Sequence, residues 1–277
     1  MASIETNQSS SCRTVEGSVG VTKSRVQTIL KKHKFKPYKF HVVQNLQLGD
    51  AERRVEFCNW YLQNVNRENH FERMIIWSDE SHFTSAGIFN RQNTRFWCQE
   101  NQHVIFPRER QGRFGFSVSC FILGSKIFYN IFEGGLTANK YLEILENIVP
   151  EIVENVPLAH LNSLYLQQDG APAHNAQIVR AYLNNNFPER WIGTYGPVRW
   201  PPRSPDLTVL DFFLWGYLQN KIYTVQYQTM ADLREATERA FRELQARPFI
   251  ILNALRRITI MCETCLRHNG EQFEQYL

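Results

Sequence analysis

The pattern of apolar and polar positions along the chain predicts strands and helices that alternate over most of its length. Gly124 and Ser125 separate two of the strand-like runs, which predicts a hairpin. Runs typical of strands cover residues 73–78, 114–121, 126–132, 160–168 and 196–200. Apolar residues at spacings of three and four predict helices over residues 23–33, 50–64, 137–149, 175–186, 205–223, 231–246 and 250–267. Strands followed by helices on one sheet indicate an α/β fold.

Three carboxylates stand at the ends of predicted elements. Asp79 follows the first strand, Asp169 follows the fourth, and Asp211 lies near the start of the helix that Pro205 opens. Strand ends are where open α/β sheets build sites, and hard cations such as Mg²⁺ need few carboxylates because they keep several waters. Two such ions about 4 Å apart can promote phosphodiester cleavage. Spacing alone leaves open an alternative in which these residues are helix caps and turn formers, since the chain has 27 acidic residues.

The N-terminal part is basic. Residues 1–11 are polar and predicted to be flexible, and residues 12–34 have the order of a partial helix-turn-helix: a short helix, Gly20, and a second helix after Thr22. From residue 21 to residue 40 there are seven Lys or Arg and no Asp or Glu, an excess that can neutralise phosphates. A solvated helix face is the alternative. The candidate DNA contacts here are Lys23, Arg25, Lys31 and Lys32. Residues 35–49 read as a linker to a domain over residues 50–277.

Composition excludes few functions or partners. A net charge of +4 is too small to indicate a nucleic-acid partner by itself. The six cysteines are scattered, and the one close pair, Cys262 and Cys265, lacks the second pair that a structural zinc site usually needs. We therefore expect reduced thiols on an ordinary helix. No apolar run reaches the roughly 20 residues of a membrane span, so we expect a soluble intracellular protein without a membrane partner.

Three sequence blocks carry a resemblance. WSDESHF (77–83), QDGAPAH (168–174) and SPDLTVLDFFLW (204–215) resemble, in order, the three catalytic blocks of mariner-superfamily transposases. The resemblance spans about residues 12–223. It implies a ribonuclease H-like fold, with a mixed central sheet flanked by helices, in which one Asp of each block coordinates Mg²⁺ or Mn²⁺ as a two-ion site. These are Asp79, Asp169 and Asp211. Asp206 is interpreted as a helix-start residue instead.

The chain also departs from the family pattern. Asp169 and Asp211 are further apart than in many relatives, which resembles a long-spacing subgroup, and the extra residues fall in 184–200, which we interpret as a loop. Relatives carry two helix-turn-helix units, whereas only the end of the second is recognisable here, so we expect an N-terminally truncated copy. Ser119 stands where relatives usually have Trp, which we interpret as a change in the core.

Other residues near the blocks have two readings each. Glu80 points away from Asp79 on a strand and is predicted to be structural or to support the site. His174 contacts DNA, supports the metal site, or caps the next helix. Trp200 and Arg203 line a DNA path, or serve respectively in the core and in a surface ion pair.

By resemblance, the function is DNA transposition: metal-dependent cleavage at transposon ends and strand transfer into TA targets, by a homodimer. The basic stretch from Lys31 to Lys39 is consistent with nuclear import. Two alternatives stay open. One is a DNA-binding relic or host-adopted protein without catalysis, and the other is a metal-dependent nuclease acting on RNA, which the basic N-terminal helices do not favour.

Overall fold

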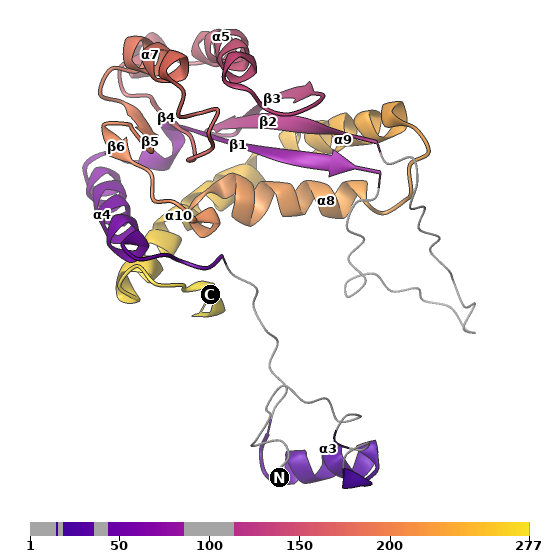
Figure 1. Ribbon diagram of the computed structural model, residues 1–277. Coiled ribbons are helices and arrows are strands. Elements are labelled where there is room, and N and C mark those ends of the chain that lie inside the picture. The colour runs from indigo at the N-terminus through magenta and orange to yellow at the C-terminus, as the bar shows by residue number, and fades with distance from the viewer. Residues whose placement is uncertain (1–14, 16–18, 36–43, 86–113, 277) are drawn as a thin grey trace. The chain divides into compact units, whose positions relative to one another are not determined.

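The computed structural model describes residues 15, 19–35, 44–85 and 114–276, which belong to two compact units, 1–42 and 43–277 (Figure 1). In the first unit, helix α3 (Lys23–Lys32) follows Thr22, as predicted, although the Thr22 side chain makes no capping hydrogen bond. Val26 is the buried residue of this helix. The predicted flexible segment 1–11, most of the helix predicted over 13–19 and most of the predicted linker lie outside the described residues.

The second unit is built on a six-stranded mixed sheet with strand order β3-β2-β1-β4-β5-β6. The first three strands are antiparallel, and the predicted hairpin at Gly124 is confirmed. The last three strands run parallel to β1. The bounds are β1 Ile75–Thr84, β2 Gly115–Leu123, β3 Lys126–Phe132, β4 Tyr165–Gln167, β5 Trp191–Gly193 and β6 Val198–Arg199.

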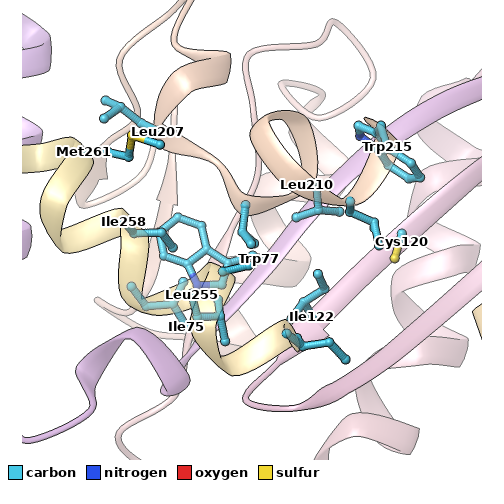
Figure 2. Packing of buried hydrophobic residues seen from close by; sticks show 14 of the residues in the cluster. Ile75, Trp77, Cys120, Ile122, Leu207, Leu210, Trp215, Leu255, Ile258 and Met261 are labelled. Atoms are coloured by element: carbon cyan, nitrogen blue, oxygen red, sulfur yellow. The ribbon is translucent and has the colours of Figure 1, made fainter. Parts of the chain in front are cut away.

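Helices cover both faces of this sheet (Figure 1). Ile76 on one face of β1 packs with α5 (Ala138–Glu154) and α7 (Gln177–Asn186), whereas its neighbour Trp77 packs on the other face. That second face carries α4 (Asp50–Arg67), α8 (Gly216–Ile222), α9 (Met230–Gln245) and α10 (Pro248–Arg267). Figure 2 shows Trp77 and Ile75 meeting Leu255 and Ile258 in this layer. A strand that is buried on both faces has a continuous apolar run, which is why Ile75, Ile76 and Trp77 stand together.

Short elements complete the second unit. They are η1 (Phe71–Arg73), α6 (Leu158–Leu161), η2 (Pro205–Leu207), the π-helix η3 (Leu210–Trp215) and η4 (Glu274–Tyr276). Threonine caps fix two of the long helices, because Thr137 and Thr229 each accept a backbone N–H three residues ahead. None of the helices in the described part of the chain is both long and apolar enough to cross a membrane.

Several predicted boundaries were wrong. β1 continues five residues past Asp79 to Thr84, because the antiparallel pairing with β2 extends to Thr84 opposite Gly115. The strand predicted over 160–168 is limited to β4, and α6 occupies the start of that run. A separate strand, β5, was missed in the region interpreted as a loop. The single helix predicted over 205–223 is divided into η2, η3 and α8.

Candidate active site

The three predicted acidic residues come from three separate segments that meet beside β1. Asp79 lies within β1, and Asp169 lies two residues after β4, the parallel neighbour of β1. Asp211 is the second residue of the π-helix η3, which packs against β1. The prediction that Asp79 ends its strand was wrong. Asp79 nevertheless lies near the end of β4, because β4 is short and its last residue, Gln167, pairs with Trp77, two residues before Asp79.

The carboxyl groups are close enough to change one another's ionisation. Burial, together with the charges of Asp211 and Glu80, raises the pKa of Asp79 well above its usual range. Asp211 keeps an exposed surface, yet the surrounding protein desolvates its carboxyl group and, with the charge of Asp169, raises its pKa to about 6. A hydrogen bond with Asp79 partly offsets this rise. A site that resists negative charge in this way favours a bound cation.

Asp79 is held from the η3 side by an indole. The Nε1–H group of Trp215 donates a hydrogen bond of 2.6 Å to Oδ2 of Asp79. Trp215 is the last residue of the π-helix that also carries Asp211, four positions earlier. One turn of chain therefore supplies both a neighbouring carboxylate and a donor to Asp79.

Asp169 is held from the other side of the site by His174. The Nδ1–H group of His174 lies 2.6 Å from Oδ1 of Asp169, and the backbone N–H of Ala171 donates to the same oxygen at 2.9 Å. Burial raises the pKa of Asp169, but the hydrogen bond and the positive charge of His174 outweigh burial and lower it. Asp169 is therefore ionised.

His174 also reaches Glu80. Its Nε2 atom lies 3.2 Å from a carboxylate oxygen of Glu80, whose other oxygen accepts a 2.6 Å hydrogen bond from the hydroxyl of Ser119. Burial lowers the pKa of His174, but Glu80 and Asp169 together raise it to about 10, so the ring is an imidazolium at neutral pH. His174 does not cap the next helix, because the N-cap position of α7 is Ala176.

This arrangement explains Ser119, which was predicted to be a change in the core. The residue is fully buried and lies opposite Glu80 in the β1–β2 ladder. A short hydroxyl there both fits and supplies the donor that the partly buried carboxylate needs. Glu80 was predicted to be structural or supporting, and its contacts with Ser119 and His174 agree with the second reading.

The block that contains Asp211 is fastened to α4 by two ion pairs. Arg54 donates to both carboxylate oxygens of Asp206, at 2.7 and 2.5 Å, and to Oγ of Ser204 at 2.9 Å. Arg203 donates two hydrogen bonds to the buried carboxylate of Asp50. These bonds lower the pKa of Asp50. Asp206 is thus committed to Arg54, in agreement with the choice of Asp211 as the third acid.

Arg54 also donates to the carbonyl oxygen of Gly270, just after α10, at 2.7 Å. Gly270 has a φ of +81°, and an added Cβ would lie 2.1 Å from the backbone oxygen of Ala51. Only glycine fits this crossing, which brings the end of α10 onto the start of α4.

The remaining candidate DNA contacts occupy two kinds of place. Lys23, Arg25, Lys31 and Lys32 are all exposed on α3. Trp200 is buried against Phe57 and Trp77, which matches the core reading of this residue. Arg203 does form an ion pair, but its partner Asp50 is buried, so the reading of a surface ion pair was wrong in that respect. A contact of Arg203 with DNA stays a prediction.

Sequence reasoning missed two supporting residues. Trp215 stands in the same block as Asp211, four residues later, so its place beside the site was open to a helical-spacing argument. Arg54 gave no such signal, because its partners are about 150 residues away in the sequence.

No protein-family profile and no curated protein matches the sequence. Solved structures do. A Mos1 mariner paired-end complex with Mn superposes with a TM-score of 0.77 at 17% identity, covering 99% of this chain and 78% of that one. The Mos1 strand transfer complex gives 0.74 at 17%, covering 99% and 77%. The catalytic domain of Mos1 mariner transposase gives 0.64 at 18%, covering 84% of this chain and all of that one.

These likenesses establish the architecture. The similarity of the backbone extends over nearly the whole length of the chain, which includes the mixed sheet. The protein therefore has the ribonuclease H-like fold of the Mos1 transposase catalytic domain.

Proposed function

We propose that this protein is a DNA transposase, which cleaves phosphodiester bonds and joins DNA strands with the help of divalent cations. The convergence of Asp79, Asp169 and Asp211 carries the proposal, because three carboxylates from distant segments meet at one place in the fold. The likeness to Mos1 transposase structures that include pre-cleavage and strand transfer complexes supports it.

The donor set suits Mg²⁺ or Mn²⁺. Both cations prefer oxygen ligands, and the raised pKa values of Asp79 and Asp211 reflect charge that a cation would neutralise. Among the described residues, no three or more His, Cys, Asp or Glu side chains are arranged so that they could hold a metal ion. Mg²⁺ usually keeps several waters and binds through one or two carboxylates and substrate phosphates, so waters and the DNA phosphate would share the cation with these residues. When bound, such cations activate the attacking oxygen and stabilise the leaving one.

The chain's own residues hold the carboxylates in place for this chemistry. Trp215 fixes one oxygen of Asp79 and His174 fixes one oxygen of Asp169, so both carboxylates are held in one orientation. Asp211 is the most exposed of the three and is the natural side chain to face substrate. The protonated ring of His174 keeps Asp169 ionised without occupying its other oxygen.

Finer features of the proposal rest on the sequence resemblance. They are two cations at the site, transposon ends as the DNA substrate, TA as the target, a homodimer and a nuclear location. The exposed basic face of α3 supports a role in DNA binding, with Lys23, Arg25, Lys31 and Lys32 contacting phosphates as part of a helix-turn-helix.

The experiment is nicking of supercoiled plasmid DNA by the purified chain in Mn²⁺, in Mg²⁺ and in EDTA. Asp169→Asn tests the site, since it keeps the volume of the side chain and removes its charge. Asp232→Asn is the matched control, because Asp232 is an exposed Asp on α9. An RNA of the same sequence, assayed beside the DNA, tests the alternative of a metal-dependent nuclease that acts on RNA.

We expect metal-dependent nicking of DNA by the parent and by Asp232→Asn, and a loss of at least about a thousandfold in Asp169→Asn. Equal activity of Asp169→Asn and the parent would overturn the assignment. Salt-dependent DNA binding by a folded parent without any nicking would favour the non-catalytic DNA-binding protein instead.

A further inference from the structure

The indole of Trp215 is an unusual neighbour for a carboxylate at the proposed metal site. Its Nε1–H group donates to Oδ2 of Asp79 at 2.6 Å, a short bond for an uncharged donor. Among the described residues, Trp215 is the side chain other than an acid that donates a hydrogen bond to the Asp79 carboxylate. The charges that act on Asp79 come from three further acids, Asp211, Glu80 and Asp169.

The position of the indole is set by packing. Trp215 is 6% exposed, and its ring meets the ring of Phe83 edge-on, with centroids 6.2 Å apart. Phe83 lies four residues after Asp79 on β1, so both side chains point to the face of the strand that η3 covers. Figure 2 shows Trp215 beside Leu210 and Cys120 in this layer. A ring fixed in the core presents its N–H group in one direction only.

The bond has a consequence for Asp79. With Oδ2 held by the indole, the carboxylate cannot rotate freely, so the direction in which Oδ1 points is fixed as well. Donors outside the metal shell orient ligating groups in this way, and their loss commonly weakens metal binding by 10- to 100-fold.

We propose that Trp215 is a positioning residue, which orients the Asp79 carboxylate for a divalent cation. This inference rests on the proposed function. It goes beyond the three acidic residues because it assigns a role to a side chain that touches neither the cation nor DNA.

The test compares Mn²⁺ binding to the full chain and to Trp215→Phe, measured by electron paramagnetic resonance of the free ion. Phenylalanine keeps an aromatic ring against Phe83 and removes the donor. Trp191→Phe is the matched control, since the indole of Trp191 is also buried and donates its N–H to an uncharged side chain, the amide of Asn184. If Trp215→Phe does not fold, Trp215→Met replaces it, because methionine fills irregular apolar space without a strong donor.

The expected result is an Mn²⁺ dissociation constant raised at least tenfold in Trp215→Phe and unchanged in Trp191→Phe. The Mn²⁺ concentration for half-maximal nicking should rise in parallel, while the rate at saturating Mn²⁺ recovers most of the parent value. An affinity within twofold of the parent would overturn the inference and leave the proposed function standing. A folded parent that neither binds Mn²⁺ nor nicks DNA would overturn both.

Discussion

The buried ion pair between Arg54 and Asp206 gives the sharpest prediction about stability. Replacing Arg54 by Met removes four hydrogen bonds: two to Asp206, one to Ser204 and one to the carbonyl of Gly270. The side chains of Arg54 and Asp206 are 0% and 2% exposed, so the Asp206 carboxylate left behind has no solvent to replace its partner. Breaking a buried pair on one side typically costs about 3–5 kcal/mol of folding free energy.

Replacing both partners should cost less than replacing one. The double variant Arg54→Met with Asp206→Leu leaves no unpaired charge, and apolar replacements of buried pairs are often close to neutral. Ser204 and the Gly270 carbonyl still lose a donor, at about 1 kcal/mol each. We therefore expect the double variant to be more stable than Arg54→Met by about 1–3 kcal/mol.

Urea unfolding followed by circular dichroism measures these differences, with Arg234→Met as control. Arg234 pairs with Glu238 on the exposed surface of α9, where an ion pair contributes at most about 1 kcal/mol. A loss below about 1 kcal/mol in Arg54→Met would contradict this expectation. So would a double variant whose loss equals the sum of the losses in Arg54→Met and Asp206→Leu alone.

Three further predictions concern the site. The pKa of Asp211 is raised to about 6, so its ionisation destabilises the fold increasingly as the pH rises from the usual pKa of an Asp to 6, and this cost persists at higher pH. In EDTA at pH 7.5, Asp211→Asn should therefore be more stable than the parent by up to about 1 kcal/mol after solvent screening, and a less stable variant would contradict this. The pKa of His174 is raised to about 10, so the stability that its charged ring contributes is fully present below about pH 6.5 and is lost as the pH rises through 10. From pH 6 to 10, the urea midpoint should therefore decline less steeply in His174→Gln than in the parent, and parallel slopes would argue against the charged ring. Ser119→Ala removes the 2.6 Å bond to Glu80 and should lower unfolding free energy by about 1.5–3 kcal/mol, whereas an unchanged urea midpoint would show that water replaces the hydroxyl.

Local patterns predicted most helices and the long strands, because those elements depend on apolar spacing within one segment. The apolar run that includes Ile75, Ile76 and Trp77 indicated a strand, and the structure buries this strand on both faces. Asp79 and Asp169 were found at the ends of predicted strands, where sites in such sheets form, and Asp211 was found near a predicted helix start. The resemblance selected these three from the other acids.

Features that depend on distant partners were not predictable in this way. β1 extends beyond Asp79 because β2, some 40 residues later, pairs with the mixed polar and apolar residues up to Thr84. The very short β5 lacks enough residues to show a period. Arg54 reads as an ordinary helix-surface residue until Asp206 is brought onto it by the fold.

The most direct test of the account is strand transfer. The purified chain is incubated in Mn²⁺ with a labelled duplex that carries a free 3′-hydroxyl end and with a TA-rich supercoiled plasmid. The same assay is run with four variants: Asp79→Asn, Asp169→Asn, Asp211→Asn and Asp232→Asn. We expect labelled plasmid with the parent and Asp232→Asn and none with the other three variants. Joined product from any of those three variants at the parent's level would contradict the assignment of the site.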